Sequence, residues 1–236
     1  MQRYFASKIN DHVILGDDDV HHLLHVMRIK KGEEIEVVID NTLYNALIKE
    51  TNPLDIKINY QIPSDSEIKE EVTLFFALAK GDKIDFVIQK ATELGVSRII
   101  LFKSSRCVVK YDDRDLEKKL TRFKKIAKEA SEQCHRLKIP EIIGVVDINK
   151  IDPSLLSDIN LVAYEKVAGS TNNFISSVKQ GKSISMMIGP EGGFSNEEIM
   201  SLVAHNFSCV SLGKRILRTE TAAVYALSVI ASILEN

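Results

Sequence analysis

Two loops near the C-terminus combine glycines with charged residues that could act on a bound molecule. The first, residues 189–193, follows an apolar strand and contains Glu191. Its glycines let the backbone approach a ligand closely and expose amide groups to it. The second, residues 212–222, contains Arg218 and Glu220. The two loops together predict a ligand pocket with one arginine and two carboxylates at its edge.

Arg218 carries the strongest chemical signal in these loops. It stands immediately before a predicted helix, where the positive end of the helix dipole disfavours a cation. We therefore expect it to face an anionic partner, such as a phosphate or a deprotonated base. Thr219 and Glu220 also have a structural explanation, because threonine caps helices and a carboxylate suits the dipole. A plain glycine-rich turn is the alternative for the first loop, although Ser195 and Glu198 directly after it have the spacing of a capping box.

The spacing of the glycines excludes two common nucleotide sites. The first loop does not read Gly-x-Gly-x-x-Gly, and no Gly-Lys-Ser/Thr follows a phosphate-binding loop. A dinucleotide dehydrogenase and a nucleoside triphosphatase are therefore disfavoured. The pattern suits a ligand held mainly by backbone groups of several loops, such as a methionine joined to an adenosine.

The elements that position these loops predict an α/β domain. From residue 72 onward, apolar strands alternate with amphipathic helices, as in a parallel sheet covered on both faces. Helices are predicted to start after Gly81-Asp82, near residue 113 and near residue 219. The predicted strands are residues 72–79, 98–102, 141–146, 160–164, 183–188 and 208–212. Both charged loops then follow carboxyl ends of strands, which is where α/β sheets bind ligands.

The first 70 residues predict a small β-barrel. Short alternating strands are expected at residues 13–15, 34–39, 43–48 and 56–60. Asp40-Asn41 suits a tight hairpin turn. One helix, capped by an aspartate among residues 17–19, is expected to extend to Met27. Residues 61–71 are polar and contain Pro63, so the predicted domains are 1–70 and 71–236.

Composition limits the function classes. A hydrophobic share of 44% and a charged share of 27% are ordinary for a soluble globular protein. No apolar stretch reaches the roughly 18 residues that span a membrane, and the N-terminus lacks the core of a secretory signal, so we expect a cytoplasmic protein. The net charge is −2, yet residues 103–138 contain twelve Lys or Arg against six Asp or Glu, whereas residues 1–72 contain eight against fourteen. The basic segment is compatible with nucleic acid.

No metal centre is expected. His21, His22 and His25 lie close in sequence, but no carboxylate or cysteine accompanies them at a known ligand spacing. The three cysteines are far apart and form neither a Cys-x-x-Cys pair nor a disulfide framework, so they are interpreted as packing residues.

Six motifs in order resemble a known family. They are residues 3–5, 22–28 with Gly32, Lys80 with 89–96, 129–136, 188–195 and 212–222. In these motifs the chain is similar to the 16S ribosomal RNA uridine N3-methyltransferases, the ribosomal RNA small subunit methyltransferase E family of the SPOUT or trefoil-knot superfamily. The resemblance runs essentially from end to end.

The resemblance implies a fold, a cofactor and partners. The fold would be a PUA-like N-terminal β-barrel that helps to grip RNA, followed by an α/β methyltransferase domain whose end threads through a loop as a knot. The implied cofactor is S-adenosylmethionine, bound in the knot. The implied partners are 16S rRNA or the small ribosomal subunit and a second copy of the chain, with neither a membrane nor a metal.

The resemblance also implies site residues. The cofactor would be held by Tyr164, Glu165, Ile188, Gly189, Pro190, Gly192, Gly193, Leu212, Gly213, Ile216, Leu217, Thr219, Thr221 and Ala222. RNA contacts are expected from Arg3, Arg28, Lys90, Arg106 and Arg136.

Methylation of uridine N3 requires removal of a proton from a nitrogen that is mostly protonated at neutral pH. We expect Arg218 to stabilise the anionic base and Glu191 or Glu220 to accept the proton. Two alternatives stay open at this point. One is a SPOUT methyltransferase that acts on a different nucleotide, and the other is a non-catalytic RNA-binding protein of ribosome assembly.

Overall fold

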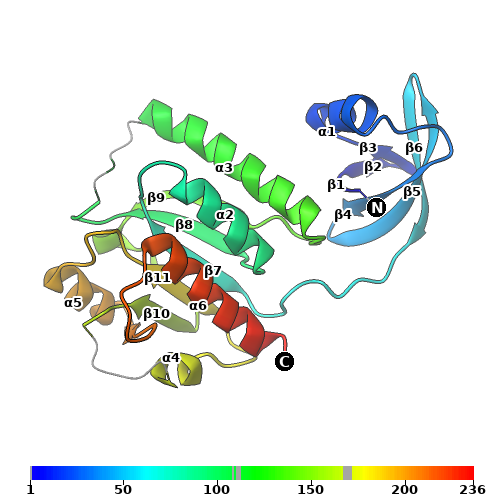
Figure 1. Ribbon diagram of the computed structural model, residues 1–236. Coiled ribbons are helices and arrows are strands. Elements are labelled where there is room, and N and C mark those ends of the chain that lie inside the picture. Colours follow the sequence, from blue (N-terminus) through cyan, green and yellow to red (C-terminus); the bar gives the residue numbers. More distant parts are fainter. Residues whose placement is uncertain (1, 108, 110–112, 167–171) are drawn as a thin grey trace. The chain divides into compact units, whose positions relative to one another are not determined.

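The computed structural model describes residues 2–107, 109, 113–166 and 172–236 (Figure 1). The chain forms two compact units, Met1–Glu67 with Ser131–Lys138, and Ile68–Ala130 with Ile139–Asn236. The sequence placed the domain boundary after residue 70, three residues beyond the end of the first segment. It did not predict that residues 131–138 group with the N-terminal unit, because composition does not show which distant segments pack together.

The N-terminal unit is built on a six-stranded sheet in the order β1-β4-β5-β6-β3-β2. Only β1 and β4 pair in parallel among the ladders of this sheet. The strands are β1 (Arg3–Phe5), β2 (Ser7–Ile9), β3 (His12–Ile14), β4 (Glu34–Ile39), β5 (Thr42–Thr51) and β6 (Leu54–Gln61). Strands β1 and β2 stand at opposite ends of this order, yet only Ala6 separates them in the chain. The sheet must therefore curl on itself, which is the shape expected of a small barrel.

The centre of the N-terminal unit is apolar. Tyr4, Leu23, Val37 and Ile48 are each at most 1% exposed. Leu23 comes from the predicted helix, which forms as α1 (Asp17–His21) continued by a π-helical turn, His22–Val26. The N-cap is Gly16, so the prediction that an aspartate caps this helix was wrong. The Asp40-Asn41 hairpin is confirmed by positive φ angles of 49° and 59°, which a tight primed turn requires.

The C-terminal unit contains a six-stranded sheet in the order β12-β10-β11-β7-β8-β9, and all of its ladders are parallel. Its strands are β7 (Val72–Ala77), β8 (Arg98–Lys103), β9 (Glu141–Asp147), β10 (Ile159–Ala163), β11 (Ile184–Ile188) and β12 (Phe207–Val210). The central strands β7 and β11 are buried along their whole length. A parallel sheet covered on both faces produces this continuous burial, so the predicted α/β fold is confirmed.

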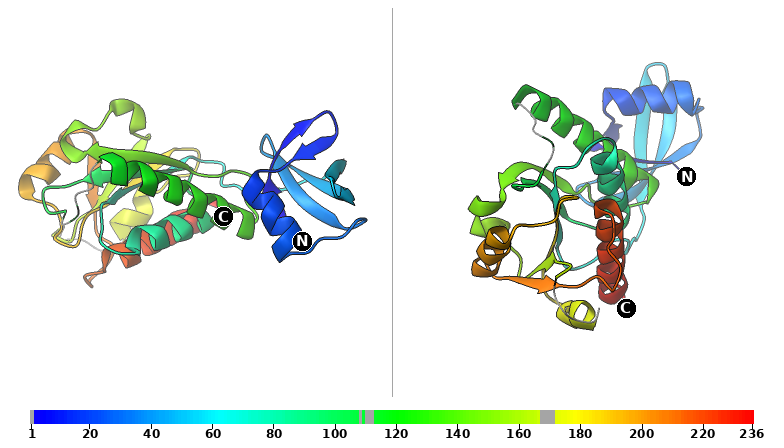
Figure 2. Two further views of the ribbon diagram at one scale, coloured as in Figure 1. Left: turned by 90° about the horizontal axis from the view of Figure 1, so that it is seen from above. Right: turned by 60° about the vertical axis from the view of Figure 1, so that its left-hand side comes forward.

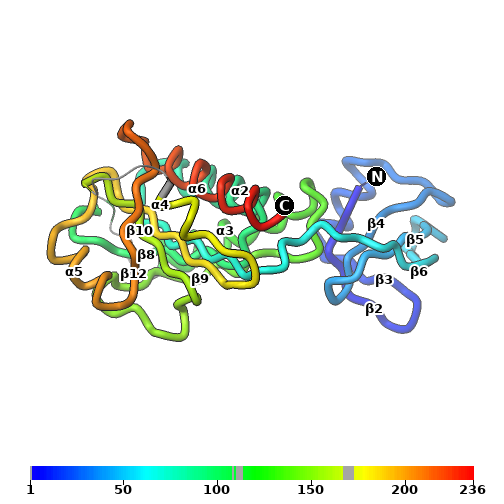
Figure 3. The backbone as a smooth tube through the Cα atoms, turned by 90° about the horizontal axis from the view of Figure 1, so that it is seen from below, coloured from blue at the N-terminus to red at the C-terminus, as the bar shows by residue number. Residues whose placement is uncertain are grey.

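Helices cover both faces of this sheet (Figures 1 and 2). Leu74 and Phe76 of β7 pack with α2 (Lys83–Glu93), α3 (Asp113–Gln133) and α6 (Thr219–Leu234). Phe75 and Ala77 point to the other face, where α5 (Asn196–Ala204) packs. Helices α2 and α6 lie side by side (Figure 3). This packing fixes the starts of α2 and α6, and therefore the loops before them, at the carboxyl edge of the sheet.

The shortest elements were not predicted from the sequence. Strands β1 and β2 have three residues each, and α4 (Asn172–Ser177) has six. Such lengths are too short to show a hydrophobic period. The threading of the C-terminal segment through a loop stays a prediction.

Candidate active site

A cavity of about 570 Å³ lies at the carboxyl edge of the second sheet. Its walls come from four places: the end of β10 with the residues after it, the end of β11 with the loop that follows, the segment from the end of β12 through the first turn of α6, and the first residue of α2. The lining residues are Lys83, Ala163, Tyr164, Glu165, Ile188, Gly189, Pro190, Glu191, Gly192, Gly193, Phe194, Ser211, Leu212, Gly213, Arg215, Ile216, Leu217, Arg218, Thr219 and Ala222. All four segments belong to the C-terminal unit.

The loop after β11 is held in a defined shape. A Cβ atom on Gly189 would lie 2.7 Å from Cε2 of Phe194, so only glycine fits there. Gly193 has a φ of 66°, and its N–H donates to the Pro190 carbonyl at 2.8 Å. Phe194 is 2% exposed and stacks on Phe102 with a centroid distance of 6.2 Å. Gly189 and Gly193 have no side chain of their own, so a ligand can approach the backbone of this loop closely.

The predicted capping box anchors the far end of this loop. The Ser195 N–H donates to Oε2 of Glu198 at 2.9 Å, and the Glu198 N–H donates to Oγ of Ser195 at 3.2 Å. Glu198 is 3% exposed and also accepts a hydrogen bond from the Ser105 N–H at 2.7 Å. Burial opposes ionisation of Glu198, but the hydrogen bonds from Ser195 and Ser105 outweigh it and lower the pKa of this carboxyl. The buried Glu198 carboxylate therefore has hydrogen-bond partners on both oxygens, and these bonds fix the end of the loop.

The segment before α6 presents Arg218 to the cavity. Arg218 is the N-cap residue, and its side chain makes no capping hydrogen bond. Its carbonyl accepts from the Ala222 N–H at 2.8 Å, which starts the helix. Thr219, which the sequence offered as a cap, is instead the first residue of the helix, and its Oγ1 donates to Oε2 of Glu220 at 3.2 Å. The exposed guanidinium lies beside a helix N-terminus, where an anion is favoured.

Lys83 joins the two carboxylates of the site, and the sequence did not single it out. Its Nζ donates to Oε1 of Glu191 at 2.8 Å and lies 3.7 Å from Oε2 of Glu220. The hydrogen bond to Glu191 raises the pKa of the Lys83 ammonium. Burial opposes ionisation of both carboxyl groups, but hydrogen bonds and the charge of Lys83 hold the pKa of Glu191 and of Glu220 below the ordinary value. Both carboxylates are therefore ionised at neutral pH.

Comparison with known proteins identifies the family. A model of an RNA methyltransferase domain matches residues 66–231, and a model of the PUA domain of RNA methyltransferases matches residues 15–59. The ribosomal RNA small subunit methyltransferase E of Bacillus subtilis is 34% identical over 98% of this chain and 96% of its own length. The chain belongs to the ribosomal RNA small subunit methyltransferase E family.

Solved structures agree with membership of the methyltransferase E family. A Legionella pneumophila protein, described as a methyltransferase with bound cofactor SAM, has a TM-score of 0.89 and 30% identity. The Neisseria gonorrhoeae ribosomal RNA small subunit methyltransferase E, bound to S-adenosyl methionine, has a TM-score of 0.84 and 29% identity. Each comparison covers 99% of this chain and 98% of the other. The predicted α/β fold with a PUA-like N-terminal domain is confirmed.

The cavity of this methyltransferase E family member contains most of the predicted cofactor residues. Thirteen of the fourteen line it, and Thr221 does not, because it lies on the exposed side of α6. Of the predicted catalytic residues, Arg218 and Glu191 line the cavity, and Glu220 reaches its edge through Lys83. Five lining residues were not among the predicted site residues: Lys83, Ala163, Phe194, Ser211 and Arg215. A signal for Lys83 was present, because it lies four residues after the end of a predicted strand, next to the helix start at Gly81-Asp82.

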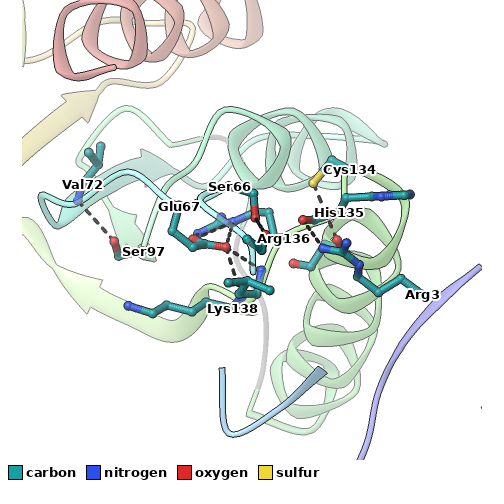
Figure 4. Close-up of polar contacts among 12 residues, drawn as sticks. Arg3, Ser66, Glu67, Val72, Ser97, Cys134, His135, Arg136 and Lys138 are labelled. Carbon is teal, nitrogen blue, oxygen red and sulfur yellow. Dashed lines mark hydrogen bonds and ion pairs between the residues drawn. The ribbon is translucent and has the colours of Figure 1, made fainter. Parts of the chain in front are cut away.

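Two of the predicted RNA contacts are buried inside the N-terminal unit. Arg3 donates to Glu36 at 2.8 Å and to the His135 carbonyl, and its side chain is 5% exposed. Arg136 donates to Glu67 at 2.7 Å and is equally buried (Figure 4). Both guanidinium groups already have anionic or carbonyl partners within the chain. We do not retain them as RNA contacts.

The other three predicted RNA contacts are accessible. Arg28 is exposed and follows the π-helical turn with a φ of 54°. Lys90 pairs with Glu93 at 2.8 Å and keeps a third of its side chain exposed. Arg106 is exposed, and its guanidinium donates to the Gly192 carbonyl at 2.9 Å. Arg106 therefore braces the loop after β11, which is a role that its residue type did not predict.

The described residues show neither a metal-holding group nor a membrane-spanning helix. Among the described residues, no group of three or more His, Cys, Asp or Glu side chains is arranged to hold a metal ion. Within the same part of the chain, no helix is long and apolar enough to cross a bilayer.

Proposed function

We propose that this protein transfers a methyl group from S-adenosylmethionine to N3 of a specific uridine in 16S rRNA of the small ribosomal subunit, in the cytoplasm. The observation that carries the proposal is the cavity at the carboxyl edge of the parallel sheet, with Arg218, Lys83 and two carboxylates at its edge. Family membership supports an RNA substrate.

The lining residues suit S-adenosylmethionine. Ile188, Leu212 and Leu217 provide apolar walls beside the backbone of two glycine-containing loops. The carboxylates of Glu165 and Glu191 among the lining residues complement a sulfonium cation. The cavity volume falls inside the range of roughly 300–1,000 Å³ for small-molecule sites. When bound, the cofactor supplies an electrophilic methyl group. Isothermal titration calorimetry should show saturable binding, and the absence of heat at millimolar cofactor would count against the assignment.

The residues at the cavity edge match the demands of N3 methylation. The nitrogen must lose its proton as it bonds to the methyl carbon, so the site needs a proton acceptor and a cation that stabilises the anion. We assign the cation to Arg218 and the proton acceptor to Glu191 or Glu220. The loops that hold these side chains bring the base and the methyl group into line, which is a positioning task.

The decisive experiment identifies the methylated nucleoside. Small subunits from a strain that lacks the gene are incubated with the protein and S-adenosylmethionine, and the nucleosides of 16S rRNA are resolved by mass spectrometry. N3-methyluridine should appear. Another methylated nucleoside would indicate a methyltransferase of different specificity, and cofactor-independent RNA binding without transfer would indicate an assembly protein.

We propose Arg28, Lys90 and Arg106 as RNA contacts, because their side chains are accessible. A cation that contacts one phosphate contributes about one unit to the slope of log affinity against log salt. Arg28→Gln should therefore reduce that slope by about one unit. Arg3→Gln should instead lower the thermal stability of the protein, because Glu36 would lose the two hydrogen bonds that the buried guanidinium donates to it.

We propose that the protein is a homodimer whose methyltransferase units pack together. Helix α6 has no charged residue from Thr221 to Leu234, although Thr221, Tyr225, Ser228 and Ser232 on its outer side are exposed. A helix without a charged face is usually buried, and a second copy would bury this one. Sedimentation velocity should give twice the 26.5 kDa mass of the chain. Tyr225→Asp should shift the protein to the monomer, whereas Tyr60→Asp in the N-terminal unit should not.

A further inference from the structure

Lys83 occupies a central place among the charged groups of the cavity. It is the first residue of α2, the helix that follows β7, whereas Glu191 follows β11 and Glu220 lies in the first turn of α6. One ammonium group thus connects three loops that belong to three different strand–helix connections. The Lys83 side chain also lines the cavity.

The contact between Lys83 and Glu191 is not needed to hold the fold. The side chains of Lys83 and Glu191 are 33% and 39% exposed. Exposed ion pairs of this kind contribute little to stability. The loop after β11 already has its own anchors in the capping box and in the burial of Phe194. The pair is therefore accessible to a ligand and free to change partners.

The pairing creates a chemical difficulty that a change of partner would remove. While Lys83 binds Glu191, the carboxylate is stabilised in its ionised form and is a weak base. Proton transfer from uridine N3 to Glu191 is then unfavourable. If the ammonium moves to an oxygen of the uracil ring, Glu191 becomes a stronger base at the moment when the ring needs a counter-charge.

We propose that Lys83 is a further catalytic residue, whose ammonium leaves the Glu191 carboxylate and binds a carbonyl oxygen of the target uracil as the N3 proton passes to Glu191. This rests on the proposed uridine N3 methylation. The N3–H bond breaks and an O–H bond forms on Glu191, so one cation–anion pair replaces another. N3 then uses its electron pair to bond to the methyl carbon, whose bond to sulfur breaks with its electrons remaining on sulfur. Glu191 later releases the proton to solvent.

The neighbouring charged groups are consistent with this exchange. Glu220 lies 3.7 Å from Lys83 and can keep the ammonium near the cavity after Glu191 is released. The positive charge of Lys80, which precedes α2, favours the ionised form of Glu191, and that of Arg218, the N-cap of α6, favours the ionised form of Glu220. Burial, together with the nearby negative charge of Glu191, raises the pKa of the Cys107 thiol, so this thiol stays neutral at physiological pH.

The test is the pH dependence of single-turnover methylation with saturating RNA and cofactor. At neutral pH, Lys83→Gln should lower the rate by roughly 10²–10³-fold, as the loss of one stabilising donor does in other enzymes. The deficit should shrink as pH rises, because solvent base then deprotonates uridine without help from the cation. Lys83→Arg should recover much of the rate. The exposed Lys179 precedes β11 at the opposite edge of the sheet, and Lys179→Gln should behave as wild type.

Three results would overturn the proposal. These are a Lys83→Gln rate equal to wild type, a rate lowered by one constant factor at every pH, or a Lys83→Arg variant as slow as Lys83→Gln. Calorimetric cofactor affinity, expected to stay within about twofold of wild type, shows that the variant is folded. A wild-type protein that forms no N3-methyluridine would refute the proposed function itself, which distinguishes that failure from failure of the role of Lys83.

Discussion

Two ion pairs of similar length have opposite roles in the two units of this protein. In the N-terminal unit, Arg136 and Glu67 are 2.7 Å apart, and their side chains are 5% and 15% exposed. In the C-terminal unit, Lys83 and Glu191 are 2.8 Å apart, and their side chains are 33% and 39% exposed. Distance alone does not distinguish a structural pair from a functional one. Accessibility and the number of additional partners do.

The additional partners explain the contrast. Glu67 also accepts hydrogen bonds from the backbone N–H groups of Leu137, at 2.7 Å, and Lys138, at 3.2 Å (Figure 4). Both oxygens of this carboxylate accept hydrogen bonds from residues 136–138, which holds that segment within the N-terminal unit. Glu191 faces a cavity instead. A buried pair resists exchange because separating the partners leaves a charge in a poorly solvated site, whereas a pair at a cavity can accept a substrate.

The largest effect should come from breaking the buried pair. Glu67→Gln removes the negative charge that pairs with the buried Arg136 guanidinium, so the free energy of unfolding should fall by about 3 kcal/mol or more. Urea unfolding followed by circular dichroism measures this change. The matched control is Glu50→Gln, which removes the exposed partner of Lys31 and should cost less than about 1 kcal/mol. Equal losses in the two variants would contradict the contrast between buried and accessible pairs.

The next largest effect should be a loss of methylation rate without a loss of stability, on substitution of Arg218. Arg218 lines the cavity and makes no capping bond, so Arg218→Ala should leave the unfolding free energy nearly unchanged. Its single-turnover rate with saturating RNA should fall by roughly 10²–10³-fold, because a donor to the developing anion is lost. Lys214→Ala, which changes an exposed cation of the same segment outside the cavity, serves as the control. Full activity of Arg218→Ala would disprove its assigned role.

The sequence predicted this molecule best where the signal was local. The parallel sheet followed from alternating periods of apolar residues, and the cavity loops followed from glycines beside strand ends. Thr221 was misplaced because the α-helix turns by about 100° per residue, so a residue two positions after Thr219 faces away from the cavity. A contiguous motif does not show which side of its helix meets the ligand.

The charged residues were harder to interpret because their partners are distant in sequence. Arg136 was predicted to bind RNA, yet its partner Glu67 lies 69 residues away. Lys83 was overlooked, and Glu191 lies 108 residues from it. A lysine or arginine is usually solvated, so only the tertiary fold reveals which of them is buried and which reaches a cavity.

A smaller effect should follow from adding a methyl group at Gly189, in the loop after β11 that is proposed to hold the cofactor. Gly189→Ala would place a methyl group 2.7 Å from the buried ring of Phe194, which stacks on Phe102. Overpacking of this kind costs about 1–3 kcal/mol, and the displaced loop should also bind S-adenosylmethionine more weakly. Gly144→Ala is the control, because a Cβ there would meet Leu120 at an ordinary 3.5 Å. Similar thermal shifts and cofactor affinities in both variants would show that the loop tolerates the added atom.

The smallest effect is the pH dependence of the stability that the accessible Lys83–Glu191 pair contributes. The folded protein lowers the pKa of Glu191 and raises that of Lys83, in each case through their mutual hydrogen bond. The contribution of Glu191 is present above the pKa of its unfolded carboxyl and is lost as pH falls through the folded value. That of Lys83 is present below the pKa of its unfolded ammonium and is lost as pH rises through the folded value. Lys83→Gln should therefore reduce the unfolding free energy by at most about 1 kcal/mol between these limits, and the difference from wild type should vanish in acid. A loss at neutral pH as large as that of Glu67→Gln would mean that Lys83 holds the fold together and does not exchange partners.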